Sequence, residues 1–245
     1  MDINGSVALV TGANRGLGRQ FAQQLLERGA AKVYATARRP ELVDVPGVEP
    51  LRLDITDPAS VAAAAETAGD VTLLVNNAGI STGANLVTGD LAEIHRELDT
   101  HFFGTLGMVR AFAPVLGRNG GGAIVNVLSA LSWFGIDGAN AYHVAKAAEW
   151  ALTNGVRLEL SGQGTLVTGV HLGAAATDMM GDYDGPMSDP ADVVRTALDG
   201  VAKRQLEVIV DDWSAGVKAS LAGDPAAFYG PVSYTHLTLP TNREV

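Results

Sequence analysis

The sequence predicts an α/β protein with a single doubly wound parallel sheet of about seven strands and helices on both faces. Short apolar runs of β type alternate with longer segments of helical type along the whole chain. The length of 245 residues suits one large domain, and a composition of 47% hydrophobic but only 6% aromatic residues suits helices packed on a buried sheet. Alternation of this kind predicts strand–helix–strand units.

The elements follow one another in a regular order, beginning with the strand VALV and ending with the strand around EVIV. The expected strands cover residues 7–10, 32–36, 48–53, 72–75, 123–128, 166–171 and 206–210. The expected helices cover residues 18–28, 58–68, 91–116, 140–160 and 190–203. Only the second and third strands are joined without a helix.

The chain shows no repeat, low-complexity tract or Pro/Ser-rich linker, so residues 1–230 are expected to form one catalytic domain. The last fifteen residues, PVSYTHLTLPTNREV at 231–245, break this style because they are rich in Thr and other polar residues. They could form an edge strand or a flexible tail. They also resemble translated adapter or vector DNA, and we favour a non-native sequence scar.

Charge and residue types exclude several classes of function. Seventeen basic residues against 27 acidic ones give a net charge of −10, which is atypical of proteins that bind nucleic acid or anionic membranes. The chain has no cysteine, and its five histidines show no metal-ligand spacing, so no metal site is expected. Without a basic leader or an apolar stretch of about 18 residues, the chain is expected to be cytoplasmic.

A glycine-rich turn, TGANRGLG, joins the first strand to the first helix. Glycines at Gly12, Gly16 and Gly18 let the backbone approach a pyrophosphate, and the helix that follows supplies N–H groups and a positive dipole end. The spacing G-x-x-x-G-x-G differs from G-x-G-x-x-G, and a simple tight turn is the alternative. Its place in a strand–helix–strand unit favours a Rossmann-like dinucleotide site.

Basic residues stand where a dinucleotide site would bind the adenosine ribose. An NAD-selective site commonly has an acid at the end of the second strand. Here that region has Arg38 and Arg39, and Arg15 lies within the glycine loop. Guanidinium groups are suited to a 2′-phosphate, so NADP(H) is favoured over NAD(H). The alternative is that exposed loops carry Arg for solubility, above all at Arg39.

Tyr142 and Lys146 are four residues apart in AYHVAKAAEW, and Ser129 lies thirteen residues before Tyr142. Residues i and i+4 share one helix face, so the ammonium can lie beside the phenol. A tyrosine that exchanges protons near neutral pH needs its pKa lowered by roughly 3, or about 4 kcal/mol, and a nearby cation acts in that direction. Ser129 could hold a carbonyl oxygen meanwhile. A solvated helix face is the alternative reading of Y-x-x-x-K alone.

Together these motifs resemble the short-chain dehydrogenase/reductase family over about residues 5–222. The loop TGANRGLG matches T-G-x-x-x-G-x-G, NNAG at residues 76–79 follows the fourth strand, and HLGAAATDM resembles P-G-x-x-x-T. Asp54 matches the acid that binds the adenine amino group. The resemblance implies cofactor contacts at Gly12, Asn14, Arg15, Gly16, Leu17, Gly18, Arg38, Asp54, Asn77, Ala78, Gly79, Tyr142, Lys146, Gly173 and Thr177.

The resemblance also implies an activity. Hydride would pass between NADP(H) and a carbonyl or secondary alcohol of a small, fairly apolar substrate, with Tyr142 as general acid/base, Ser129 holding the oxygen and Lys146 lowering the tyrosine pKa. A nucleotide-binding regulatory protein with little turnover is the alternative, and epimerisation or dehydration is a third. Family members often pair through two long helices, so a homodimer or homotetramer is expected.

The sequence departs from the family at two positions. His101 stands where the family usually has Asn, which holds a water in the proton relay. An imidazole can also donate and accept, so His101 could keep the relay and make it titrate near neutral pH; a buried, satisfied histidine is the equal alternative. Leu172 replaces the family's Pro and is expected to loosen a turn beside the nicotinamide.

The remaining aromatic and histidine residues near these motifs are assigned mainly to packing. His143 points away from Tyr142 on the helix, and His171 ends a strand. Residues on the loops after Ser129 and Thr177 could form an apolar substrate pocket with a mobile lid. These residues are Trp133, Phe134, Met179, Met180 and Tyr183.

Overall fold

The computed structural model describes residues 1–229, so the segment at 231–245 lies outside the described residues. Seven parallel strands form one sheet in the order β3-β2-β1-β4-β5-β6-β7. The strands are β1 Val7–Thr11, β2 Lys32–Ala37, β3 Glu49–Arg52, β4 Leu73–Asn76, β5 Ala123–Val127, β6 Leu166–His171 and β7 Glu207–Ile209. The predicted fold class is confirmed.

The order of the strands reverses between β1 and β4. From β1 the chain builds outward through β2 and β3, and it then returns to pair β4 with the other side of β1. The loops that follow these two central strands therefore separate at the carboxyl edge of the sheet. A crevice at such a switch point is the usual ligand site of an open parallel sheet.

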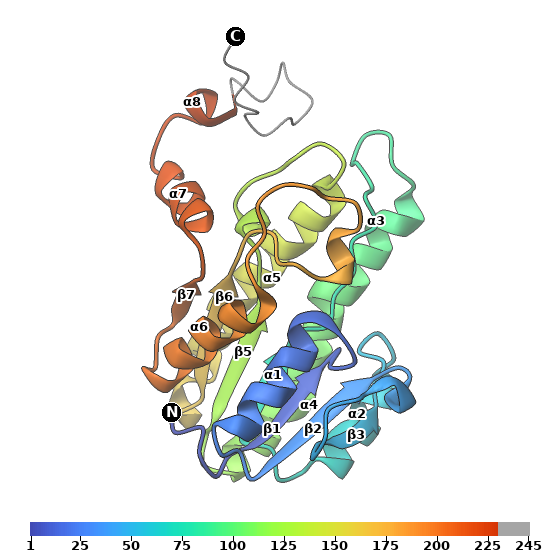
Figure 1. Ribbon diagram of the computed structural model, residues 1–245, viewed down its shortest axis with the longest axis vertical. Coiled ribbons are helices and arrows are strands. Elements are labelled where there is room, and N and C mark those ends of the chain that lie inside the picture. The colour runs from blue at the N-terminus through green and yellow to red at the C-terminus, as the bar shows by residue number, and fades with distance from the viewer. Residues whose placement is uncertain (230–245) are drawn as a thin grey trace.

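Helices cover both faces of the sheet because side chains alternate along each strand. Ala8 and Val10 of β1 pack with the helices α1 (Gly16–Glu27) and α6 (Pro190–Ala202), which lie toward the viewer in Figure 1. Leu9 points the other way, into a second core cluster. That cluster includes residues of α2 (Pro58–Thr67), α4 (Thr105–Arg118) and α5 (Asn140–Glu159).

Two helices begin at the same short signal. The side chains of Asp57 and Asp189 accept the backbone N–H two residues later, and each aspartate is followed by a proline at the first helical position. An aspartate cap satisfies a free N–H and favours the helix dipole, while proline loses no helical hydrogen bond there.

The long helix expected at 91–116 is not one regular helix. It consists of α3 (Leu91–Leu98), a π-helical segment η2 (Asp99–Gly104) and α4. A π-helical turn widens the backbone spiral, and such turns are frequent at functional sites. His101 lies inside η2, so the irregular segment carries one of the predicted site residues.

The described residues include further short helices that the sequence did not suggest. After β7 come α7 (Asp212–Ser220) and α8 (Pro225–Tyr229), which continue upward from the sheet in Figure 1. Short 3₁₀ turns lie at η1 Pro40–Leu42, η3 Ala130–Ser132, η4 Ser161–Gln163 and η5 Asp178–Met180. None of the described helices is long and apolar enough to cross a membrane.

Backbone conformation explains the glycine at residue 12, and close packing explains the one at residue 18. Gly12 has a φ of +66°, in the left-handed region that favours glycine. A Cβ on Gly18 would lie 2.2 Å from the carbonyl oxygen of Gly12 and 2.6 Å from Nδ2 of Asn77. The start of α1 therefore packs directly on the loop, and any side chain at residue 18 would force the two apart.

We expect Gly18→Ala to lower the free energy of unfolding by about 1–3 kcal/mol, since the added methyl group meets backbone that cannot move aside. Gly216→Ala in α7 is the matched control, because a Cβ there meets nothing within 4 Å. It should be neutral or stabilising by about 0.5–1 kcal/mol through helix propensity. Urea unfolding of both variants measures the difference, and equal effects would contradict the packing argument.

Candidate active site

A cavity of about 1530 Å³ lies along the carboxyl edge of the sheet. It extends from the glycine loop to the loops after β5 and β6. All four predicted catalytic residues line it, and so does every predicted cofactor residue except Gly18, which packs beneath the loop. The fold thus brings together residues from positions 12 to 177 of the chain.

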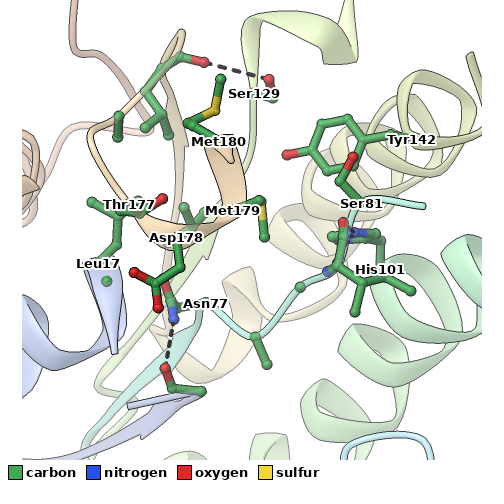
Figure 2. Close-up of a pocket in the computed structure, with 18 of the residues that line it drawn as sticks. Leu17, Asn77, Ser81, His101, Ser129, Tyr142, Thr177, Asp178, Met179 and Met180 are labelled. Carbon is green, nitrogen blue, oxygen red and sulfur yellow. Dashed lines mark hydrogen bonds between the residues drawn. The ribbon is translucent and has the colours of Figure 1, made fainter. Parts of the chain in front are cut away.

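One hydroxyl group fixes the floor of the cavity. Oγ1 of Thr11 accepts the backbone N–H groups of Asn77 and Ala78, each at 2.9 Å. Nδ2 of Asn77 returns a hydrogen bond to the carbonyl oxygen of Thr11 at 2.9 Å. It also lies 3.4 Å from the carbonyl oxygen of Gly12, the bond marked below Asn77 in Figure 2. These bonds tie the NNAG segment to the end of β1, beside the glycine loop.

The far end of the cavity carries positive charge. Arg38 is exposed and lines the cavity after β2, together with Arg39. Arg15 also lines it and pairs with Asp178 at 3.3 Å, with both side chains largely exposed. Oδ1 of Asp54 accepts bonds from the backbone N–H and the hydroxyl of Thr56.

These residues are suited to a dinucleotide, with basic side chains near its expected adenosine ribose. Gly12 and Gly16 both have positive φ and leave no side chain in the turn, and Arg15 and Arg38 could neutralise an anion there. Asp54 would receive the adenine end, and the cavity continues to Tyr142. The lining residues therefore fit a nicotinamide dinucleotide in extent.

Ser129 is the first residue after β5 that turns away from the sheet. It caps the turn η3, and its Oγ accepts the N–H of Leu131 at 3.0 Å and lies 3.5 Å from the carbonyl oxygen of Leu172. Leu172, where the family usually has Pro, is buried and its carbonyl also accepts the N–H of Ala130. The phenol oxygen of Tyr142 points into the cavity toward Met180 in Figure 2.

Lys146 is buried behind Tyr142. Its Nζ donates to the carbonyl oxygen of Val127 at 2.8 Å and to Oε2 of Glu149 at 2.7 Å, and lies 5.7 Å from the centre of the Tyr142 ring. Burial acts to lower the pKa of the ammonium, but the charges of Glu149 and Tyr142 outweigh it and the pKa is raised. Lys146 therefore stays positively charged.

The pKa of Tyr142 is raised, contrary to the lowering expected from the Tyr/Lys spacing. Burial is the largest cause, and the carboxylates of Glu149 and Glu97 add to it. Lys146 does lower the pKa, as predicted, but it does not prevail. Tyr142 therefore holds its proton at neutral pH.

The sequence did not reveal two buried carboxylates behind the site. Glu97 and Glu149 are buried on either side of His101, with carboxylate oxygens 3.3 Å from its Nε2 and 3.8 Å from its Nδ1. Glu97 stands four residues before His101, and Glu149 three residues after Lys146. That helical spacing was the available signal for both contacts.

The other histidines near the site have structural roles, as predicted. Nδ1 of His143 lies 2.6 Å from the carbonyl oxygen of Leu131. His171 is fully buried and stacks on Trp133 with the ring centres 3.9 Å apart. Burial lowers the pKa of His171 to about 4, so its ring is neutral at pH 7.

Apolar side chains surround the open end of the cavity near Tyr142. Phe134, Met179, Met180 and Tyr183 all line it, whereas Trp133 lies behind it against His171. In Figure 2, Met179 and Met180 face Tyr142 across the cavity. Methionine side chains are flexible and polarizable, so this wall can adapt to apolar groups of different shape.

Comparison with known proteins agrees with this site. A family model described as short chain dehydrogenase matches residues 6–186. The chain belongs to the short-chain dehydrogenase family. The expected resemblance is thereby confirmed, and the predicted catalytic residues Ser129, Tyr142 and Lys146 lie within the matched part.

Relatives of this short-chain dehydrogenase differ in the substrates they are named for. It is 33% identical over 75% of its length to an NADPH-dependent 1-acyldihydroxyacetone phosphate reductase from Schizosaccharomyces pombe, of which it spans 64%, just under two thirds. It is also 33% identical to a 3-alpha-(or 20-beta)-hydroxysteroid dehydrogenase from Mycobacterium bovis, over 83% of this chain and 79% of that one.

Solved structures of the family include complexes with both cofactors. A short chain dehydrogenase from Burkholderia cenocepacia J2315 in complex with NADP superposes with a TM-score of 0.91 at 38% identity, covering 96% of this chain and 100% of that one. A 3-ketoacyl-(acyl-carrier-protein) reductase from Brucella melitensis complexed with NADH has a TM-score of 0.79 at 25% identity, covering 85% and 98%. The protein is therefore an oxidoreductase of a family that binds nicotinamide nucleotides.

The neutral state of His171 gives a prediction about stability and pH. Its pKa is about 4 in the folded protein, against an ordinary value of 6.5 for a histidine in water. As pH falls below about 6.5, His171 takes up a proton in the unfolded chain but not in the folded protein. The free energy of unfolding therefore falls by about 3 kcal/mol between about pH 6.5 and 4. Chemical unfolding of the parent and of His171→Gln at several pH values measures this. The difference in free energy of unfolding between the parent and His171→Gln should shrink as pH falls. A difference that stays constant with pH would refute the neutral state of His171.

Proposed function

We propose that this protein is an NADP-dependent carbonyl reductase or alcohol dehydrogenase that acts on a small, fairly apolar substrate. The observation that carries the proposal is the convergence of Ser129, Tyr142 and Lys146 on one wall of the nucleotide-sized cavity. A regulatory protein without turnover would not need a buried ammonium beside a phenol that faces the cavity. Residues 1–230 form the catalytic domain in this proposal.

The protonated state of Tyr142 favours the reductive direction. Bound NADPH would supply the hydride to the carbonyl carbon. The Tyr142 phenol, whose pKa is raised, donates its proton to the carbonyl oxygen while the Ser129 hydroxyl holds that oxygen. Lys146 stabilises the phenolate that this step leaves behind, because its ammonium lies beside the ring.

The basic end of the cavity supports NADP(H) over NAD(H). Arg38 is exposed at the end of β2, where an NAD-selective site would have an acid. Arg15 lines the same cavity from the glycine loop and is held by an exposed pair with Asp178, which a 2′-phosphate could replace at little cost. The NADP complex of the Burkholderia relative supports the same choice.

The apolar open end of the cavity supports a substrate with a hydrophobic body. Phe134, Met179 and Met180 supply contact surface without fixed polar groups. The proposal includes a homodimer or homotetramer and a cytoplasmic location, where a reductase can draw on NADPH. Large apolar side chains at Phe103 and Leu158, 57% and 77% exposed, are available for pairing. Light scattering of the purified protein tests the assembly.

Replacing the phenol tests the chemistry directly. We expect Tyr142→Phe to lower kcat for carbonyl reduction by about 10²–10⁴, the usual contribution of a positioned acid, while the variant still binds NADPH. Tyr34→Phe is the control, because its hydroxyl contacts Asp70 outside the cavity. Turnover is followed at the nicotinamide absorption band with a panel of ketones and aldehydes. NADPH binding without oxidation by any of them would favour the regulatory alternative.

Removing one guanidinium tests the cofactor preference. We expect Arg38→Ala to weaken NADPH binding by about 10- to 100-fold, since hydrogen bonds to charged groups contribute about 1.5–3 kcal/mol, and to leave NADH binding unchanged. Arg52→Ala removes the same charge from an exposed position on β3 that does not line the cavity. Fluorescence titration measures both cofactors. Equal affinity of the parent for NADPH and NADH would overturn the proposed preference.

A further inference from the structure

Four ionisable side chains meet in the interior behind Tyr142. Glu97, His101, Lys146 and Glu149 are 0%, 1%, 5% and 2% exposed. They come from three elements, α3, η2 and α5. A cluster of buried charges is costly unless every charge has a partner, so its presence calls for a physical reason.

Each carboxylate is anchored by one oxygen and offers the other to the cluster. Oε1 of Glu97 accepts the backbone N–H of Thr82 at 2.6 Å, and its Oε2 lies 3.3 Å from Nε2 of His101. Oε1 of Glu149 accepts a hydrogen bond from the hydroxyl of Thr105 at 3.0 Å. Its Oε2 lies 2.7 Å from Nζ of Lys146 and 3.8 Å from Nδ1 of His101. His101 is therefore held between two fixed acceptors.

The surroundings of the imidazole suit its charged form. Nε2 lies 2.9 Å from the carbonyl oxygen of Ile80, and Nδ1 has no hydrogen-bond partner among the described residues but faces Glu149 at 3.8 Å. A neutral imidazole has one N–H and would turn a bare nitrogen toward one of these acceptors, whereas an imidazolium donates on both sides. The nearest backbone donor, the N–H of Ile80, lies farther away, at 3.3 Å from Nε2.

The balance of charge points the same way. Two carboxylates against one ammonium leave the cluster one negative charge in excess. Burial acts to raise the pKa of Glu97, but its contacts with His101 and the Thr82 amide outweigh burial and lower the pKa, so this carboxylate stays ionised. An imidazolium at His101 would bring the sum of the four groups to zero.

We propose that His101 and Glu149 form an internal relay that returns a proton to Tyr142 through Lys146, with Glu97 as the positioning residue that holds the imidazolium. The inference rests on the proposed function, in which Tyr142 gives a proton to substrate. It assigns roles to two glutamates that touch neither substrate nor cofactor.

The proton balance of one reductive turnover is closed. Tyr142 loses its phenolic proton to the substrate oxygen, and an N–H proton of Lys146 passes to the phenolate through a bridging water. The Nδ1 proton of His101 passes to Oε2 of Glu149 and from there to Nζ of Lys146, which leaves a neutral imidazole. One proton taken from bulk solvent through the cavity, whose wall includes His101, then restores the imidazolium, so each reduction consumes one proton from solution. Oxidation of an alcohol runs the same steps in reverse.

Two links of the relay are open. Nζ of Lys146 lies 5.7 Å from the centre of the Tyr142 ring and forms no hydrogen bond to its hydroxyl, so a water in the cavity has to bridge them, since both residues line it. The second open link is short. Nδ1 and the Glu149 oxygen are 3.8 Å apart, so a side-chain movement of about 1 Å brings them to the length of a charge-assisted hydrogen bond. Oε2 of Glu149 already lies 2.7 Å from Nζ of Lys146. The charged and titratable groups that face the imidazole are Glu97 from α3 and Glu149, Lys146 and Tyr142 from α5.

The protonation of His101 is measured first, on ¹⁵N-labelled protein without cofactor, by long-range ¹H–¹⁵N correlation across the pH range. The His101 signals are those that vanish in His101→Asn. We expect both ring nitrogens to carry protons at pH 7.5, and one to lose its proton in Glu149→Gln. A neutral imidazole with a single tautomer in the parent protein would overturn the relay. Because this measurement needs no turnover, it stands even if the proposed reductase activity fails.

Steady-state kinetics then test the relay with a ketone that the parent reduces. We expect Glu149→Gln and His101→Asn to lower kcat by about 10- to 100-fold, a part of the usual general-acid contribution, with KM for NADPH unchanged. The kcat of the parent should be full at low pH and fall as pH rises through the titration of His101. Glu97→Gln should move that fall to lower pH, and His101→Asn should abolish it.

Controls separate the relay from a structural role. Glu159→Gln makes the same change at an exposed position of α5 and should match the parent. Thermal melting and NADPH titration show which variants are folded, and a solvent isotope effect on the parent's kcat remains informative if a variant is not. A kcat lowered by the same factor at every pH, or unchanged in Glu149→Gln and His101→Asn, would refute the proposal.

Discussion

The ammonium of Lys146 lies in the protein interior, and the rest of the site is arranged around the need to satisfy it. Taking a single charge out of water costs several kcal/mol unless partners surround it. Here the partners are the carbonyl oxygen of Val127, the last residue of β5, and the carboxylate of Glu149 on α5. One buried cation thus ties α5 to the carboxyl end of β5. Ser129 stands two residues after Val127, so the same contact helps to set its position relative to Tyr142.

The partners of Lys146 are themselves buried polar groups that need partners of their own. Glu149 brings a negative charge that also contacts Thr105 and faces His101, and His101 in turn lies against Glu97. The imidazole also needs space: a Cβ on Gly79 would lie 2.6 Å from its Cε1. Gly79 was expected only as a cofactor contact, yet in this chain it also makes room for the histidine.

The sheet and most helices could be predicted because their signals are local. Apolar runs such as VALV suit strands buried on both faces, and the Asp-Pro pairs at Asp57 and Asp189 begin helices through their own hydrogen bonds. The segment η2 could not be predicted, since its residues continue the helical pattern on either side and carry no local signal for a π-helical turn. The helices α7 and α8 are short and depend on aromatic contacts such as Phe134 with Phe228.

The site was predictable to the extent that it consists of motifs. The glycine loop and the Ser/Tyr/Lys set are recognisable by spacing and order. Glu97 and Glu149 were not recognised, because carboxylates three or four residues from a cation look like surface ion pairs of a helix. Only the fold shows that both are buried and that they face one imidazole. The direction of the Tyr142 pKa shift could not be predicted for the same reason. It depends on burial and on several charged groups whose positions only the fold reveals.

That sum links the acidity of Tyr142 to the charge on the cluster. Lys146 alone would favour the phenolate, but Glu149 lies 2.7 Å from its Nζ, so the phenol faces a pair that is nearly neutral from a distance. If the imidazole of His101 is neutral, the four groups carry one excess negative charge and the phenolate is disfavoured. If it is charged, the excess vanishes and the phenolate is tolerated. The proton that the relay holds would therefore also set how readily Tyr142 gives up its own. After one turnover His101 would be neutral, and Tyr142 would keep its phenolic proton until a proton from solvent restores the imidazolium. The next proton transfer to substrate would therefore wait for His101 to be protonated again.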